Sequence, residues 1–204
     1  MMNPAPQANK PSGVILYGGA FDPVHRAHIE VARAALRYAS LAKVVFIPSA
    51  QSPLKVHGPV ASDADRLEML RLATAAEPDF LIDDCELRRG GISYTVDTVR
   101  AFLAQQAEAE LYWIIGGDQL AQLAQWHAIG ELAQWVTFLV LARPGYPLAD
   151  PGIDGLRWLR IEAPLMPESS SRIRQRIRRQ LPVSELLAPS VEAFIQAKRL
   201  YVAP

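Results

Sequence analysis

VILYGGAFDPVHRAH, residues 14–28, decides the fold of this chain. Its initial apolar run predicts a buried strand, Gly18-Gly19 predicts a tight turn, and the amphipathic stretch that follows predicts a helix. Asp22 and Pro23 are candidates for the N-cap and the first residue of that helix. Glycines let an anion approach the backbone closely, and a helix N-terminus offers unpaired N–H groups and a partial positive charge. The segment therefore predicts a site for a polyphosphate.

Two histidines strengthen this prediction. His25 and His28 are three residues apart, so they would share one helix face and could donate to phosphate oxygens. They could also be ordinary surface histidines. Zinc is disfavoured, because the sequence has neither an H-E-x-x-H pattern nor a cysteine cluster that would supply further ligands. We therefore expect no metal site built by the protein.

The composition limits the classes of function. The chain has 204 residues, 50% of them hydrophobic, and its formal net charge is zero. A general nucleic-acid or anionic-membrane binder needs a positive surplus, so we expect neither partner. Cys85 is the only cysteine, so no disulfide can form within the chain, and a reducing, cytoplasmic location is expected. No apolar run reaches the ~18 residues of a membrane span.

The pattern along the chain predicts one domain. Residues 1–13 are rich in Pro, Asn and Gln, and we expect a flexible tail there that is not a secretory signal. Residues 14–204 are expected to form a single domain, with a C-terminal helical segment from about Ser169. An oligomer is possible, but the sequence does not predict one.

Six short apolar runs alternate with helical patterns. The runs are Val14–Tyr17, Val44–Ile47, Phe80–Ile82, Leu111–Ile115, Val136–Leu141 and Leu156–Ile161. Unbroken apolar runs are typical of strands buried on both faces of a parallel sheet. The alternation predicts an α/β fold with a doubly wound parallel sheet and C-terminal helices, in which ligands bind at the carboxyl ends of the strands.

ESSSRIR, residues 168–174, is a second candidate for anion binding. Serines before a helix are ordinary capping residues, and Ile173 and Ile177 form a core stripe that leaves part of the arginine run on a solvated face. Hydroxyl and N–H groups at a helix start also bind anions. Both interpretations stay open at this point.

Two of these segments resemble the nucleotidyltransferase superfamily. Residues 18–28 resemble its G-G-x-F-D-P-x-H-x-G-H signature, with Ala27 in place of glycine and Ala20 where many members have Thr or Ser. Residues 168–174 resemble its I-S-S-T-x-I-R signature, with Glu168 for Ile and Ser171 for Thr. In the superfamily both segments bind the triphosphate of ATP.

Further segments are similar, in the same order, to bacterial nicotinate mononucleotide adenylyltransferases. They are ELRRGGISYTVDT (86–98), IIGGDQL (114–120), Trp126 and ARPGY (142–146). The resemblance implies a Rossmann-like nucleotidyltransferase fold. It also implies transfer of the adenylyl group of ATP to nicotinate mononucleotide, which forms nicotinate adenine dinucleotide and pyrophosphate in NAD biosynthesis.

The resemblance also implies a role for individual residues. The implied catalytic residues are His25, His28, Lys55 and Arg174. The implied ATP contacts are Gly18, Gly19, Ala20, Phe21, Gly116, Asp118, Ser170, Ser171 and Arg174. The implied contacts of nicotinate mononucleotide are Tyr94, Thr95, Asp118, Trp126 and His127. Mg²⁺ is expected as a cofactor carried by ATP.

Other functions remain as alternatives. A sibling enzyme would use nicotinamide mononucleotide or another phosphate acceptor, such as pantetheine phosphate or glycerol phosphate. The SYT-x-DT segment and Trp126 disfavour the last two. A non-catalytic nucleotide-binding module is disfavoured by the presence of His25, His28, Lys55 and Arg174 together. Many family members have histidine where this chain has Leu54, so it stays open whether the nearby His57 assists Lys55.

Overall fold

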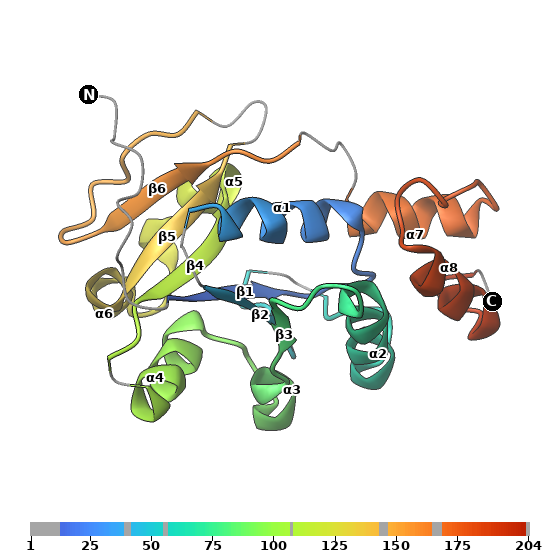
Figure 1. Cartoon of the computed structure of the whole chain (residues 1–204), viewed down its shortest axis with the longest axis horizontal. Helices are drawn as coiled ribbons and strands as arrows, with labels where there is room; N and C mark the ends of the chain where they lie inside the picture. Colours follow the sequence, from blue (N-terminus) through green and yellow to red (C-terminus); the bar gives the residue numbers. More distant parts are fainter. Residues whose placement is uncertain are drawn as a thin grey trace. The chain divides into compact units, whose positions relative to one another are not determined.

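All six predicted strands are present and lie in one parallel sheet (Figure 1). The computed structural model describes residues 13–38, 42–54, 57–106, 108–142, 147–164 and 169–202. The strands are β1 (Val14–Gly19), β2 (Lys43–Pro48), β3 (Phe80–Ile82), β4 (Leu111–Gly116), β5 (Val136–Leu141) and β6 (Arg157–Ile161). Their order in the sheet is β3-β2-β1-β4-β5-β6, which is the order of a doubly wound dinucleotide-binding sheet. The predicted fold class is confirmed.

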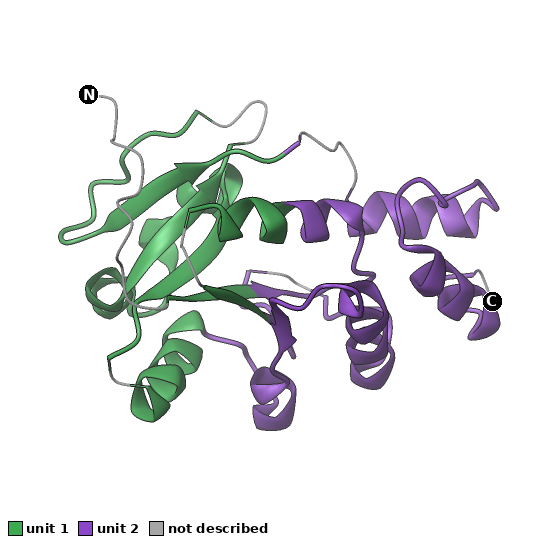
Figure 2. Ribbon diagram, viewed as in Figure 1, with its two compact units in different colours: residues 1–17, 31–45, 95–163 green, residues 18–30, 46–94, 164–204 purple. Residues whose placement is uncertain are grey.

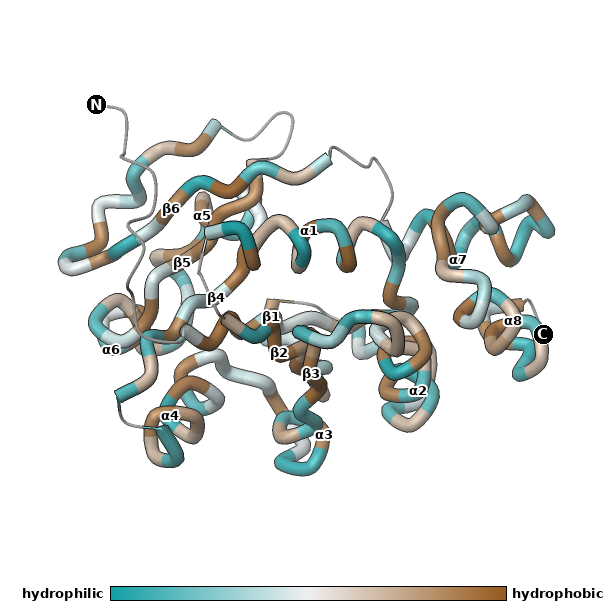
Figure 3. The backbone as a smooth tube through the Cα atoms, in the orientation of Figure 1, coloured by the Kyte–Doolittle hydropathy of each residue, from teal (hydrophilic) through white to brown (hydrophobic). Residues whose placement is uncertain are grey.

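The register is continuous on both sides of β4. Val14 of β1 lies beside Leu111 of β4, and Leu111 lies beside Val136 of β5. Every residue of β4 is buried, as is expected of a central parallel strand with both faces covered. Figure 3 shows the hydrophobic colour that runs along β5.

The helices also follow the predicted pattern. They are α1 (Arg26–Leu36), α2 (Asp63–Thr74), α3 (Cys85–Arg89), α4 (Thr95–Gln105), α5 (Gly117–Leu120), α6 (Ile129–Trp135), α7 (Ser170–Arg178) and α8 (Pro189–Ala197), with a 3₁₀ turn η1 (Leu123–Gln125). Ser62 caps α2, because its hydroxyl accepts the N–H of Asp65. Pro189 begins α8, since proline has no N–H to lose at a helix start.

One helix boundary differs from the prediction. The first helix begins at Arg26, so Asp22 and Pro23 are neither its N-cap nor its first residue. Asp22 is 3% exposed and serves other donors, which are described below. The prediction was wrong because Asp-Pro is a common helix start, and local sequence does not reveal that distant groups bind this carboxylate.

The described chain forms two compact units that alternate along the sequence (Figure 2). Unit 1 comprises residues 1–17, 31–45 and 95–163, and unit 2 comprises residues 18–30, 46–94 and 164–204. Unit 1 has its core around β4 and β5. Unit 2 packs three phenylalanine rings together, with Phe46 at 5.6 Å from Phe21 and 5.4 Å from Phe80.

Two sequence interpretations remain predictions. The single domain over residues 14–204 is one of them. The flexible tail is the other, because residues 1–12 lie outside the described part of the chain. In the part that is described, no helix is long and apolar enough to cross a bilayer.

Cys85, at the start of α3, is a half-buried free cysteine. Burial, followed by the nearby Asp83 carboxylate, raises the pKa of the Cys85 thiol to about 11. We expect iodoacetamide to alkylate Cys85 at least ~100-fold more slowly than free cysteine at pH ~8, because only the thiolate reacts. Mass spectrometry of timed samples measures this rate. Asp83→Asn should speed the reaction, and a rate equal to that of free cysteine would contradict the buried-thiol assignment.

Candidate phosphate-binding turn and pyridine site

The turn that follows β1 has a shape fixed by close packing. The backbone of Phe21 lies in the left-handed region, with φ of 46°, and its ring is 2% exposed. A Cβ atom added to Gly19 would lie 3.1 Å from that ring. Any side chain at this position would therefore push against the buried Phe21 ring, which lies directly against the backbone.

Donors from other segments hold four carbonyl oxygens of this turn. The four bonds run from Ser49 N to Gly19 O (2.8 Å), Arg66 Nη1 to Ala20 O (2.7 Å), Arg174 Nη1 to Asp22 O (2.6 Å) and Ser170 Oγ to Pro23 O (2.9 Å). Two of the donors are guanidinium groups, whose hydrogen bonds are stronger than neutral ones. An anion approaching the turn therefore meets carbonyl oxygens that are already neutralised by donors.

The two histidines lie against each other at the end of the turn. Their rings stack with centroids 3.7 Å apart, and the backbone N–H of His25 donates to Nδ1 of His28 at 3.2 Å. A ring nitrogen that accepts a hydrogen bond carries no proton, so the proton of His28 lies on Nε2. The Phe21 and His28 rings pack edge to face with their centroids 5.1 Å apart, and this packing fixes the plane of the His28 ring. His28 thus has a defined N–H donor.

Asp22 is the most heavily bonded side chain of the turn. Its carboxylate accepts the N–H groups of Val60 (2.7 Å) and Ala61 (3.1 Å) and the hydroxyl of Tyr201 (2.8 Å). Arg174 Nη1 lies 3.5 Å from the same carboxylate. Sequence reasoning missed this role, because Tyr201 is 179 residues away and no local pattern links the two.

The start of α7 is capped by a serine and contacts the turn, while anion binding by this segment stays a prediction. Ser169 is the N-cap, since its hydroxyl accepts the N–H of Arg172 at 3.4 Å. Ser170 binds the turn, and Ser171 accepts from Arg174 Nη2 at 3.2 Å. The Arg174 side chain is 21% exposed, so part of its guanidinium reaches solvent beside the turn. The structure therefore brings Ser170, Ser171 and Arg174 to residues 18–25.

The predicted pyridine-binding residues lie mostly in unit 1. Gly116 ends β4, and Asp118 lies inside α5. Trp126 follows η1 and is half-buried, with its ring edge-on to Phe138 at 6.2 Å. Its Nε1 is buried and has no hydrogen-bond partner among the described residues, while the neighbouring His127 is exposed.

The SYT segment is anchored through its serine. The hydroxyl of Ser93 accepts the N–H of Ala50 at 3.0 Å, and the Ser93 N–H donates to the Gln51 carbonyl at 2.8 Å. Tyr94 follows and is half-buried, and Thr95 is the first residue of α4. Tyr94 and Thr95 therefore stand where helix N–H groups have no partners within the helix.

Three further observations bound the candidate site. Lys55 lies outside the described residues, and the nearby Leu54 and His57 are exposed. Among the described residues, no group of three His, Cys, Asp or Glu side chains could hold a metal ion.

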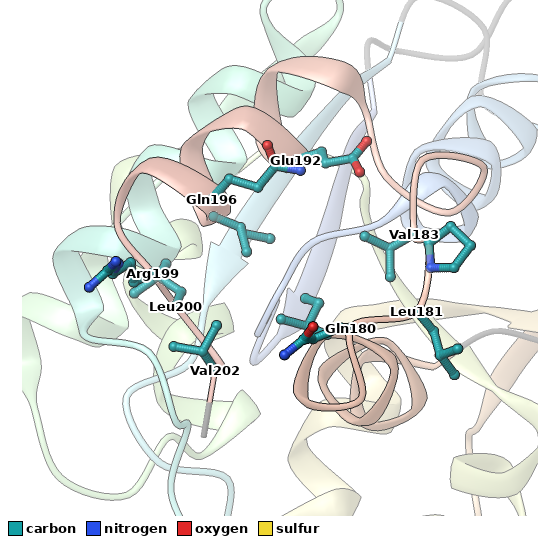
Figure 4. A pocket seen from close by; sticks show the side chains of 11 residues that line it. Gln180, Leu181, Val183, Glu192, Gln196, Arg199, Leu200 and Val202 are labelled. Carbon is teal, nitrogen blue, oxygen red and sulfur yellow. The ribbon is translucent and has the colours of Figure 1, made fainter. Parts of the chain in front are cut away.

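A groove of about 490 Å³ lies between α7 and α8, lined by residues such as Leu181, Glu192 and Arg199 (Figure 4). None of its lining residues belongs to the predicted site.

Comparison of sequences gives a consistent set of relatives. A family model described as cytidylyltransferase-like matches residues 16–176. A protein of Opitutus terrae named probable nicotinate-nucleotide adenylyltransferase is 43% identical over 185 residues, which cover 90% of this chain and 95% of that protein. A protein of Herpetosiphon aurantiacus with the same name is 39% identical over 194 residues, which cover 92% of this chain and 98% of that protein.

Solved structures share the fold. The Plasmodium falciparum nicotinic acid mononucleotide adenylyltransferase complexed with NaAD matches with a TM-score of 0.78 at 16% identity, covering 94% of this chain and 98% of that chain. A putative nicotinate-nucleotide adenylyltransferase of Vibrio parahaemolyticus matches with a TM-score of 0.71 at 14% identity, covering 95% of this chain and 98% of that chain. These likenesses confirm the Rossmann-like nucleotidyltransferase fold.

Arg66 of α2 carries a testable part of this geometry. Its guanidinium is fully buried and binds Ala20 O and the Asp63 carboxylate, each at 2.7 Å. We expect Arg66→Met to lower the free energy of unfolding by about 2–4 kcal/mol, because the Ala20 carbonyl loses its charged donor. Urea denaturation measures the loss. Arg71→Met is the matched control on the same helix: Arg71 is exposed and pairs weakly with Glu68, so equal losses in both variants would contradict the assignment.

Proposed function

We propose residue roles for this chain from one premise: it belongs to the cytidylyltransferase-like family, in which its curated relatives are nicotinate-nucleotide adenylyltransferases. It transfers the adenylyl group of ATP to nicotinate mononucleotide, and it releases nicotinate adenine dinucleotide and pyrophosphate in NAD biosynthesis. The observation that carries the role assignment is the glycine–histidine turn, with its carbonyl oxygens held by donors and the His28 proton on Nε2.

The chemistry requires positioning more than proton transfer. A phosphate oxygen of the mononucleotide attacks the α-phosphorus of ATP, a new P–O bond forms, and the bond to the departing pyrophosphate breaks. The second pKa of a phosphate monoester is near ~6, so the nucleophile is largely dianionic at neutral pH and needs no base. The enzyme must hold two anions together and stabilise the charge that develops on the leaving group.

The phosphate-binding turn is assigned to ATP. Gly18, Gly19, Ala20 and Phe21 offer backbone close to the triphosphate, and Ser170 and Ser171 lie at the start of α7 beside it. His25, His28, Lys55 and Arg174 are assigned to the phosphate oxygens, where their donors stabilise the departing pyrophosphate. Support comes from the contacts of Ser170 and Arg174 with the turn, within a single unit. Gly116 and Asp118 complete the ATP contacts in this assignment, with Asp118 on ribose hydroxyls.

The pyridine nucleotide is assigned to the SYT segment and to the residues after η1. The ring stacks on Trp126, whose indole is half-buried and held edge-on by Phe138. The nicotinate carboxylate accepts backbone N–H groups around Tyr94, Thr95 and His127. Thr95 begins the 11-residue helix α4, and the positive end of a helix dipole favours a negative group.

Mg²⁺ is proposed as an ion that arrives with ATP. Mg²⁺ is usually bound by one or two carboxylates together with substrate phosphates and several waters, so the ATP phosphates would supply ligands for it. When bound, the ion neutralises charge on the phosphates. The proposed partners are the two substrates, and we propose no role for nucleic acid or membranes. The proposed location is cytoplasmic.

His28 is the sharpest test of the catalytic assignment. We expect His28→Ala to lower kcat by roughly 10²-fold or more, because its Nε2 donor acts where charge develops on the leaving group. Stability should change little, since His28 is only partly buried. His28→Gln is the matched variant, because its amide N–H can replace Nε2–H and should restore part of kcat. Pyrophosphate release measures turnover, and near-normal kcat in folded His28→Ala would overturn the assignment.

The acceptor preference tests the pyridine site. We expect nicotinate mononucleotide to exceed nicotinamide mononucleotide by roughly 10²–10⁴-fold in kcat/KM, because an amide loses about two charge-assisted hydrogen bonds worth ~1–3 kcal/mol each. Initial rates with each acceptor at saturating ATP and Mg²⁺ give the ratio. Comparable values would favour the sibling enzyme that accepts both pyridine nucleotides.

A further inference from the structure

We propose that Tyr201, near the C-terminal end of the described chain, is a positioning residue for the ATP phosphates, acting through Asp22 and Arg174. This inference rests on the proposed function of the turn. In this proposal Tyr201 does not touch a substrate. Its hydroxyl donates to a carboxylate oxygen of Asp22 at 2.8 Å, and the same aspartate binds Arg174.

Three hydrogen-bond donors surround the Asp22 carboxylate. One carboxylate oxygen accepts from Ala61 N and the Tyr201 hydroxyl, and the other accepts from Val60 N. The Asp22 side chain is 4% exposed, so water cannot readily replace a missing donor. A buried carboxylate that loses one donor draws more strongly on those that remain.

Arg174 binds the backbone carbonyl of Asp22 more closely than the Asp22 carboxylate. Its Nη1 binds the Asp22 carbonyl at 2.6 Å but stands 3.5 Å from the carboxylate, beyond a short charged hydrogen bond. The three donors to Asp22 therefore leave the guanidinium close to, but not locked on, the carboxylate. Without the Tyr201 hydroxyl, the Asp22 carboxylate has one donor fewer and attracts this guanidinium more strongly through its other oxygen, Oδ2, which lies 3.5 Å from Arg174 Nη1. The guanidinium then moves away from the position assigned to the triphosphate.

Tyr201 is held in place by burial. Its side chain is 6% exposed, and its backbone lies in the left-handed region with φ of 63° just after α8. Leu200 and Val202 on either side line the groove shown in Figure 4, whereas Tyr201 does not. Burial raises the pKa of the Tyr201 hydroxyl well above its usual range, so it stays protonated and donates at any assay pH.

Tyr201→Phe tests this inference, because it removes the hydroxyl and keeps the ring. We expect kcat/KM for ATP to fall by roughly tenfold, the loss that corresponds to one buried hydrogen bond. The KM for nicotinate mononucleotide should stay within about twofold, because no pyridine contact changes.

Tyr112→Phe is the matched control. Tyr112 is also a buried tyrosine, 3% exposed, and its hydroxyl bonds the carboxylate of Glu110 in the other unit. Melting temperatures report the structural cost of each lost hydroxyl. A similar cost with normal ATP kinetics in Tyr112→Phe, beside a selective ATP defect in Tyr201→Phe, supports positioning.

Other outcomes are decisive against it. Unchanged ATP kinetics in Tyr201→Phe, or equal losses for both substrates that follow the melting temperature, would show that Tyr201 is merely structural. If the unaltered protein makes no pyrophosphate from the two substrates, the proposed function fails. ATP binding by calorimetry then still tests the inference, since equal affinity in the unaltered protein and in Tyr201→Phe would overturn it independently.

Discussion

The buried carboxylate of Asp22 is the constraint on which the rest of unit 2 depends. A charge at 3% exposure is tolerated only where donors surround it, and here they come from the loop at Val60–Ala61, from α7 and from the residue that follows α8. These segments are far apart in sequence. They meet around Asp22 in the folded unit, so the shape of the turn depends on contacts that form only when these segments pack together.

Two arginines beside the turn are held in place by hydrogen bonds, in a chain whose formal net charge is zero. The buried guanidinium of Arg66 binds the Ala20 carbonyl and the Asp63 carboxylate, whereas the side chain of Arg174 stays partly exposed to solvent. Planar guanidinium groups hold carbonyl oxygens with fixed geometry and keep their charge at all pH values in use. Two positive charges therefore lie beside the turn, each with its position fixed by a carbonyl oxygen.

Sequence reasoning predicted the strands and the segments of the site, because both depend on local pattern. Short apolar runs, several of them unbroken, predicted the six strands, and the glycine–histidine and serine–arginine motifs indicated segments that do meet in the structure. It missed Arg66 and Tyr201, since their partners are 46 and 179 residues away. It misassigned Asp22 as a helix cap for the same reason. Tertiary partners of buried polar groups are set by packing, which periodicity does not encode.

The alternation of the two units along the chain has a genetic consequence. Each unit is assembled from three separate stretches of sequence, and borders between the units fall inside β1, α1 and β2. Neither unit corresponds to a continuous piece of coding sequence. Recombination between homologous genes at any single crossover would therefore mix parental residues within a unit, so a single crossover cannot exchange one unit between homologues as a module.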